Sequence, residues 1–317
     1  MENHNRSRMM TEGAMMVGLA AVLGYLGQML FTPLLFLYPL PFLVLGFRQG
    51  LKTTIIAILA SLGVCSLLFM PIAALSMTLS LGLPAIAIVW AIHRGRSFGE
   101  IVIMGGLASL IGFGGAAVLF QFVSGMDLAQ YVLMITEEMR TVMEETVAAQ
   151  PNMTLEQSDL MLNQFHVMID MIKRTLPASL LIVSMIISYV NLRLMIVVLK
   201  RVNTPVPEAP QLKYFVLPQG IVLSIFVMYL AGLFLEYREY FVSGVLTQNI
   251  LILGMAIFLL QGWAVIAYLV EQRTTNKGII VLLFVSSLLV AFIQYVVLIV
   301  GMMDRFFNFR RLPHTGA

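Results

Sequence analysis

The chain has 317 residues, of which 60% are hydrophobic and only 11% are charged, whereas soluble domains carry about 25% charged residues. A mean hydropathy of +0.93 over this length excludes a soluble globular protein, because water would face too much apolar surface. The net charge of +3 is typical of a membrane protein with basic cytoplasmic loops, and no nucleic-acid partner is expected.

The apolar residues form nine blocks that recur along the whole chain. A bilayer core about 30 Å thick needs about 20 helical residues for one crossing, and most blocks reach that length. The second block is too short for a straight crossing and contains two prolines, so it is either a kinked crossing or a re-entrant hairpin. We therefore expect an all-α, polytopic transmembrane bundle of eight or nine helices. The blocks are Met9–Leu30, Leu34–Phe47, Leu51–Met70, Ile72–Ile92, Ile101–Val123, Leu176–Leu199, Phe215–Leu235, Leu246–Val270 and Gly278–Met303.

Lys and Arg residues are unevenly distributed between the loops of this predicted bundle. With a cytoplasmic N-terminus and nine crossings, eleven basic residues lie inside and four outside, the C-terminal tail excluded. This asymmetry follows the positive-inside rule, so we expect a multi-pass protein of the cell membrane with a cytoplasmic N-terminus. The tail is discordant, because Arg305, Arg310 and Arg311 would lie outside. Either one block does not cross or the tail lies at the interface.

Residues 124–175 interrupt the apolar pattern and hold eight of the sixteen acidic residues. Apolar positions recur at helical spacing on both sides of a predicted turn at Gln150–Pro151–Asn152, and Thr154 with Gln157 resembles a capping box. We expect an acidic, amphipathic helical hairpin on the extracytoplasmic side, between the fifth and sixth crossings. It is either a partner-docking element or lid, or an insertion that packs only on itself. Its many methionines are typical of helix cores, so no metal site is expected.

Motifs for nucleotide hydrolysis, dinucleotide binding and zinc binding do not occur in the sequence. The middles of the apolar blocks hold almost no ionisable residues, which proton relays and intramembrane hydrolases require. Cys65 stands alone in an apolar block and is expected to be a packing residue. The sequence therefore predicts neither an enzyme nor a resident cofactor.

Small residues at helical spacing give the first block a face that allows close helix approach. Ala14, Gly18 and Ala21 line this face, which packs either inside the bundle or against another membrane subunit. The fifth block repeats the pattern between Gly105 and Ala117.

Uncharged polar residues in or beside the blocks are the candidates for a ligand site, although interhelical hydrogen bonds explain any one of them more simply. We expect Gln28, Tyr38 and Gln121 in the outer half of the bundle, facing a small solute. Lys173 and Arg174 begin the sixth crossing and would either attract an anionic group at the rim of the site or anchor the helix at the interface.

Three stretches resemble YybS-type predicted membrane proteins of Gram-positive bacteria. They are the opening Thr11–Ala21, the Gln-Gly segment Gln261–Val265 and the ending Gly301–Arg311, with its Gly-x-x-Asp…Phe-Arg pattern. The N-terminal part of that family is similar to the substrate-binding S components of energy-coupling-factor (ECF) transporters, which are six-helix bundles without an ATPase.

This resemblance implies an S-component-like membrane bundle over residues 1–201, with the hairpin of residues 124–175 inserted, and a three-helix unit over residues 202–317. In S components an Ala-x-x-x-Ala face contacts a membrane coupling subunit, and Ala14 and Gly18 hold the matching positions here. The implied function is a transport-associated, substrate-binding subunit for an unknown small solute, with its ATPase supplied in trans. The alternative is a membrane scaffold or regulatory protein that binds other proteins and transports nothing.

Overall fold

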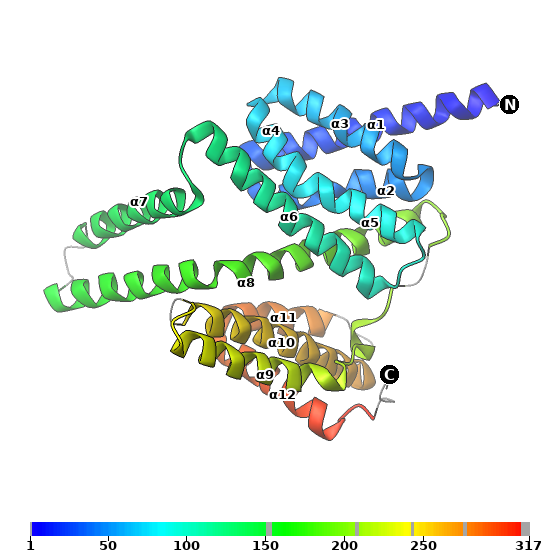
Figure 1. The fold of residues 1–317 in the computed structure, drawn as a ribbon. Coiled ribbons are helices and arrows are strands. Elements are labelled where there is room, and N and C mark those ends of the chain that lie inside the picture. The colour runs from blue at the N-terminus through cyan, green and yellow to red at the C-terminus, as the bar shows by residue number, and fades with distance from the viewer. Residues whose placement is uncertain (1, 150–153, 207–208, 242–243, 275–277, 312–317) are drawn as a thin grey trace. The chain divides into compact units, whose positions relative to one another are not determined.

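The computed structural model describes residues 2–149, 154–206, 209–241, 244–274 and 278–311 (Figure 1). These residues form twelve α-helices and three short helical turns and contain no strand, which confirms the predicted all-α fold. Seven helices are long and apolar enough to cross a membrane, and the bent pair α11–α12 makes an eighth if it counts as one span. The protein is therefore a polytopic membrane helix bundle.

The chain divides into two compact units. The first comprises residues 1–169 and 183–209, and the second comprises residues 170–182 and 210–317. Compact units need not coincide with domains, so the division into residues 1–201 and 202–317 stays a prediction.

In the first unit, the short second block brings the chain back along α1. Leu35 lies against Gly27 near the end of α1, whereas Arg48 at the end of α2 pairs with Glu12 near the start of α1. The block therefore returns to the end of α1 at which the chain began, although it is not one of the seven candidate spans. The elements are α1 (Glu2–Met29), the 3-10 helix η1 (Thr32–Leu37) and α2 (Pro39–Gln49).

A π-helical turn interrupts the candidate span Pro71–His93. This turn, η2 (Thr78–Gly82), joins α4 (Pro71–Met77) to α5 (Leu83–His93), and the three elements together form one candidate span. Such turns widen a helix locally and are frequent at functional sites. The neighbouring spans of the first unit are α3 (Leu51–Leu68) and α6 (Phe98–Ser124).

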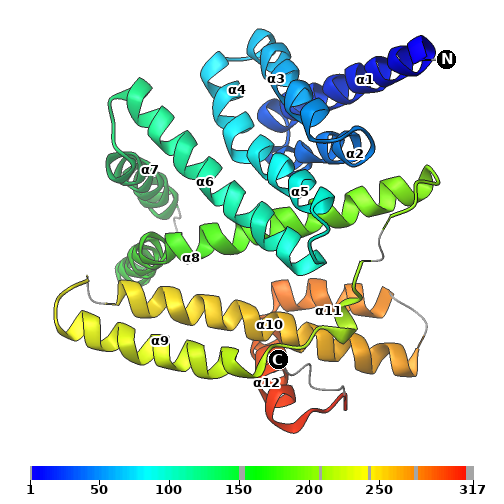
Figure 2. The ribbon, with the colours of Figure 1, turned by 45° about the vertical axis from the view of Figure 1, so that its right-hand side comes forward.

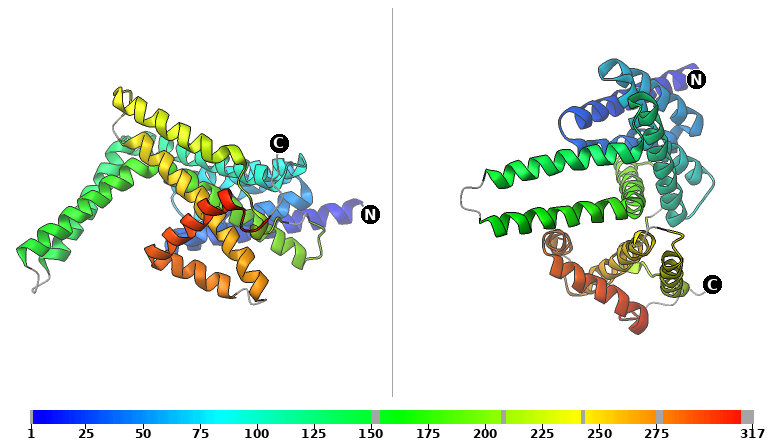
Figure 3. Two further views of the ribbon diagram at one scale, coloured as in Figure 1. Left: turned by 90° about the horizontal axis from the view of Figure 1, so that it is seen from below. Right: turned by 60° about the vertical axis from the view of Figure 1, so that its left-hand side comes forward.

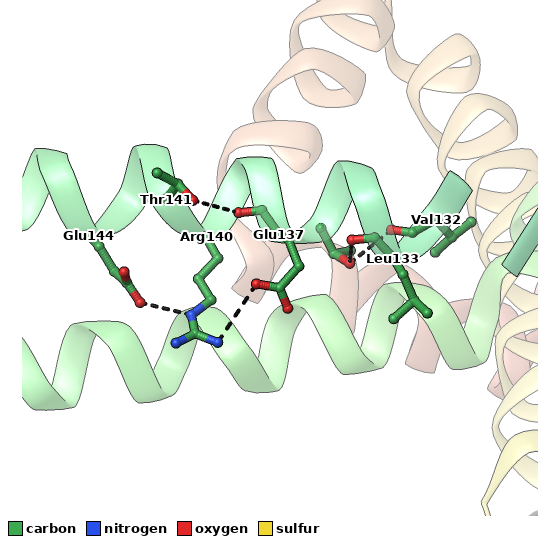
Figure 4. A network of polar contacts seen from close by, with 7 residues as sticks. Val132, Leu133, Glu137, Arg140, Thr141 and Glu144 are labelled. Atoms are coloured by element: carbon green, nitrogen blue, oxygen red, sulfur yellow. Dashed lines mark hydrogen bonds and ion pairs between the residues drawn. The ribbon is translucent and has the colours of Figure 1, made fainter. Parts of the chain in front are cut away.

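The acidic segment forms the predicted helical hairpin. Helix α7 (Leu128–Ala148) and the first part of α8 (Leu155–Arg201) run side by side (Figure 3), and the capping box of Thr154 and Gln157 begins α8 as predicted. The predicted turn at Gln150–Pro151–Asn152 lies outside the described residues. On the surface of α7, the Arg140 guanidinium lies 2.8 Å from Glu144 and 3.8 Å from Glu137 (Figure 4). The extracytoplasmic location of the hairpin stays a prediction.

The second unit is organised around α10 (Val245–Arg273). Helix α9 (Gln219–Tyr237) lies beside α10, and α12 (Ala291–Phe307) crosses it (Figure 2). Helices α11 (Gly278–Leu289) and α12 meet at an angle of 112°. A short 3-10 helix, η3 (Leu212–Tyr214), precedes α9 and packs on α10.

Candidate functional site

A first cluster of buried polar side chains surrounds the hydroxyl of Tyr38. This oxygen lies 3.2 Å from the hydroxyl of Ser61 on α3 and 3.4 Å from that of Thr78 in η2. Tyr38 and Ser61 are both 0% exposed, and the Ser61 hydroxyl also contacts the sulfur of Cys65 at 4.0 Å. The π-helical turn thus contributes one hydroxyl to a cluster in which every polar side chain has a partner.

A second set of polar contacts joins η2 to α6. The hydroxyl of Ser109 donates to the backbone carbonyl of Ser80 at 3.3 Å. One turn along α6, a β-carbon at Gly112 would lie 2.1 Å from the carbonyl oxygen of Leu79, so only glycine permits this backbone contact. The small-residue face predicted on the fifth block therefore packs inside the first unit at this point.

The third set lies on one face of α8. Ser184, Ser188 and Asn191 are at most 1% exposed and follow the i, i+4, i+7 spacing of a single helix face. The side-chain amide of Asn191 donates to the carbonyls of Phe36 at 2.7 Å and Ile187 at 2.9 Å. Its Oδ1 atom and the two serine hydroxyl oxygens are buried without a hydrogen-bond partner among the described residues. Gly105 and Gly106 of α6 face Ser188 and Met185 of α8. We call these two glycines, with Ser184, Ser188 and Asn191, the α6–α8 seam.

The structure does not gather the five predicted ligand residues at one site. Tyr38 is buried in the first cluster, whereas the side chains of Gln28 and Gln121 are exposed on the same unit. Lys173 and Arg174 are half-buried and belong to the second unit. Sequence reasoning placed Asn191 among the candidate polar residues but did not single out Ser184 and Ser188, because helical serines usually bond their own helix. The i, i+4, i+7 spacing of Ser184, Ser188 and Asn191 was the sequence pattern that could have indicated a shared polar helix face.

The predicted partner face of α1 is divided between two environments. Ala14 and Gly18 are exposed, and no atom lies within 4 Å of a β-carbon built at Gly18. Ala21, by contrast, is 3% exposed and belongs to the core of the first unit. The open part of the face is therefore the turn between Ala14 and Gly18.

Glu12, in the opening motif, holds the end of α2 against α1. Its carboxylate pairs with the guanidinium of Arg48 and accepts a hydrogen bond from the Gln49 side chain at 3.0 Å. Both partners stand at the end of α2. The acidic residue of the motif therefore fixes the return segment rather than a ligand.

The two other motifs meet in the second unit. Asp304 of α12 accepts hydrogen bonds through Oδ2 from Gln261 at 2.7 Å and from Arg310 at 2.9 Å. Arg310 also donates to the carbonyl of Lys213 at 2.7 Å, and the backbone N–H of Leu217 donates to Gln261 at 3.1 Å. We call Gln261, Asp304 and Arg310 the C-terminal clasp, because they tie α10, α12 and the tail to the segment before α9.

Glycines next to the clasp allow α10 and α12 to touch through their backbones. A β-carbon at Gly262 would lie 2.0 Å from the carbonyl oxygen of Val297, and one at Gly301 would lie 2.1 Å from that of Phe258. In η3, Lys213 donates to Glu271 at 2.6 Å, and this hydrogen bond raises the pKa of Lys213. The Gln-Gly and Gly-x-x-Asp patterns thus encode one helix crossing.

Comparison with known proteins gives a family but no characterised relative. The family model described as predicted membrane protein (DUF2232) matches residues 15–305, and this match fits the YybS-type resemblance of the three motifs. No curated protein and no solved structure matches the chain significantly. The chain belongs to the predicted membrane protein family DUF2232.

Proposed function

We propose that the protein is a transport-associated, substrate-binding subunit of the cell membrane that lacks its own ATPase. The observation that supports this proposal is the set of buried, uncharged polar side chains among the spans of the first unit. Polar groups in a membrane bundle cost free energy unless they are hydrogen-bonded, and three of these side-chain atoms have no partner in the described part of the chain. A membrane bundle that binds a small solute has a use for such groups.

The free energy for uptake would come from a coupling subunit and an ATPase in trans, because the sequence carries no nucleotide-binding motif. The open turn between Ala14 and Gly18 is the proposed contact for the coupling subunit, since small residues let two helices approach closely in lipid. In this arrangement the N-terminus is cytoplasmic and the α7–α8 hairpin is extracytoplasmic, in a Gram-positive type of envelope.

Tyr38 remains a proposed ligand residue, and its buried hydroxyl lies between those of Ser61 and Thr78. Gln28 and Gln121 remain proposed contacts from the outer half of the same unit. Lys173 and Arg174 remain proposed rim residues for an anionic group.

Native mass spectrometry of the gently solubilised protein tests the binding role. We expect a co-purifying small molecule and, in native membranes, a complex with other subunits. Ala14→Leu or Gly18→Leu should abolish the complex and leave the small molecule bound. Gly13→Leu is the matched control, because Gly13 also has open space at its β-carbon and lies off the Ala14–Gly18 turn. A complex that persists in all three variants would remove the proposed partner face.

Flux measurements in liposomes test the mechanism. The purified protein alone should bind the co-purifying molecule without accumulating it, and an imposed proton gradient should change nothing. Moving a solute uphill needs a coupled source of free energy, which this proposal assigns to another subunit. Proton-driven accumulation by the chain alone would contradict the proposal.

A membrane scaffold or regulatory protein is the second candidate. The hairpin favours it, because α7 exposes apolar residues such as Leu133 and Val142 along a helix with eight acidic residues nearby in sequence. A scaffold would co-purify with protein partners and hold no small molecule, so the same mass spectra separate the two candidates.

A further inference from the structure

The α6–α8 seam contains several buried polar atoms that have no hydrogen-bond partner. Five buried side-chain atoms lack a hydrogen-bond partner in the described part of the chain, and three of them are the seam atoms of Ser184, Ser188 and Asn191. Buried polar atoms are normally bonded, and exceptions call for an explanation such as a bound guest. Three exceptions on one helix face therefore point to a guest that supplies the missing bonds.

The serine hydroxyls of the seam differ from other helical hydroxyls of the first unit. Thr54, Ser66 and Ser80 each donate to a carbonyl four residues earlier, at 2.7 to 3.1 Å, which is the usual solution in helices. Ser184 and Ser188 make no such bond. The Ser188 hydroxyl faces α6, since a β-carbon at Gly105 would lie 2.3 Å from its oxygen.

Asn191 presents an acceptor of fixed orientation. Its Nδ2 atom donates to two carbonyls, those of Phe36 and Ile187, and only an amide nitrogen can do so. The opposite oxygen, Oδ1, is therefore assigned by the network rather than by convention. It remains an unfilled acceptor about 10 Å along the helix from Ser184, at 1.5 Å per residue.

The contacts across the seam are of a kind that can open. A β-carbon at Gly106 would meet the sulfur of Met185 at 2.5 Å, and the α-carbon of Met185 lies farther away, at 3.3 Å. The nearest contact is thus to a methionine side chain, and such side chains rearrange readily. At Gly112, by contrast, α6 meets the backbone of η2, which cannot move aside as a side chain can. A guest would therefore be admitted at Gly105 and Gly106, where α6 meets side chains of α8, while the backbone contact at Gly112 keeps α6 fixed to η2.

We propose that the α6–α8 seam binds a small, uncharged molecule that carries both a hydrogen-bond donor and an acceptor. The donor reaches Asn191 Oδ1, and the acceptor takes the hydroxyls of Ser184 and Ser188. Among the described residues of the first unit, the buried polar side chains carry only hydroxyl and amide groups. A charged guest would find no counter-charge there, and a buried charge without one is costly, so the guest is uncharged. This inference rests on the proposed function, since it names the class of solute that the subunit would take.

Cysteine accessibility of the purified full chain tests the seam, in a Cys65→Ser background. Ser188→Cys and Ser184→Cys place a thiol in the seam with little change in volume, and Ile186→Cys places one between them on the exposed side, where Ile186 is 55% exposed. The probes are 2-hydroxyethyl, 2-(trimethylammonium)ethyl and 2-sulfonatoethyl methanethiosulfonate, which are uncharged, cationic and anionic. Peptide mass spectrometry measures the rate at which each thiol is modified.

The uncharged hydroxyethyl reagent should modify both seam cysteines at least about tenfold faster than the two charged reagents do, a difference of about 1.4 kcal/mol in activation free energy. Ile186→Cys gives the rate at an exposed position of the same helix, against which the rates of the two seam cysteines are compared. Seam cysteines that stay unmodified in folded protein would overturn the inference, as would equal rates for all three reagents. The measurement needs no coupling subunit, so a failure of uptake and a failure of the seam are separate results.

Discussion

Asp304 and Arg310 form an ion pair whose side chains are 3% and 1% exposed. Both Gln261 and Arg310 bond the same carboxylate oxygen, and Oδ1 of Asp304 is buried without a partner in the described structure. A buried pair contributes little net free energy when intact, but removal of one partner leaves an uncompensated charge. The clasp is therefore sensitive to single substitutions in a way that surface pairs are not.

Arg310→Ala should lower the free energy of unfolding by about 3–5 kcal/mol, because the Asp304 carboxylate loses its cation in a buried site. Thermal unfolding in detergent, followed by circular dichroism, measures the loss. Arg140→Ala is the control, since the ion pairs of Arg140 are about half exposed and exposed pairs contribute little. Equal stability of the two variants would mean that the clasp does not hold the second unit together.

Gly262 and Gly301 are sensitive for a different reason, because each stands against a backbone carbonyl of the other helix. Gly262→Ala and Gly301→Ala should each destabilise the protein by about 1–3 kcal/mol, the usual cost of overpacking. Gly220→Ala is the control, because a β-carbon there meets nothing within 4 Å. The same unfolding measurement applies, and a stabilised Gly301→Ala variant would show that the crossing is looser than described.

At the scale of elements, α8 passes through Pro177 without ending, which is unusual because proline removes a helix hydrogen bond and crowds the preceding turn. Asn249 of α10 explains the continuity. The N–H of Ala178 donates to Asn249 Oδ1 at 2.8 Å, and Asn249 Nδ2 donates to the carbonyl of Arg174 at 2.7 Å. The amide of Asn249 thus bridges the two backbone groups that an unbroken helix would have paired directly.

Asn249→Leu should therefore destabilise the protein in the wild-type background. It leaves a backbone donor and a backbone acceptor without a hydrogen-bond partner, and each unpaired group costs about 1–3 kcal/mol of stability. In a Pro177→Ala background the loss should be much smaller, because the helix can pair Ala178 with Arg174 directly. Hydrogen exchange at the Ala178 amide gives a local readout and should accelerate in Asn249→Leu alone. Additive effects in the double variant would contradict the bridge.

Local signals in the sequence were sufficient for the elements that depend on neighbours in the chain. The capping box of Thr154 and Gln157 predicted the start of α8, and the apolar blocks located the long spans. The Asn249 bridge and the C-terminal clasp join residues 71 and 43 positions apart, and no local pattern specifies such pairs. The α6–α8 seam lay between these cases, because its spacing was visible but its unpaired atoms were not.

At the scale of the whole molecule, contacts within each unit bear on the topology. The second block returns along α1 to Glu12, which fits the cytoplasmic Arg48 and Lys52 of the positive-inside assignment. In the second unit the tail residue Arg310 donates to the carbonyl of Lys213, and α11 and α12 meet at 112°. The tail therefore reaches the segment that precedes α9. From this contact we expect α11–α12 to be a re-entrant pair rather than a crossing.

With the expected cytoplasmic N-terminus, a re-entrant pair would remove the discordance of Arg305, Arg310 and Arg311, because the tail would then lie on the cytoplasmic side with the basic segment that follows α8. Cysteines at Gln211 and Phe309, in a Cys65→Ser background, should resist a membrane-impermeant maleimide in intact cells and react after the cells are opened. A cysteine at Thr141 on α7 should react in intact cells, since the hairpin is expected outside. Gln211 and Phe309 must behave alike whichever way the protein is inserted, because the clasp contacts place them at the same end of the second unit. Labelling of Phe309→Cys without Gln211→Cys would show that α11–α12 crosses the membrane, and labelling of both without Thr141→Cys would keep the re-entrant pair but invert the protein.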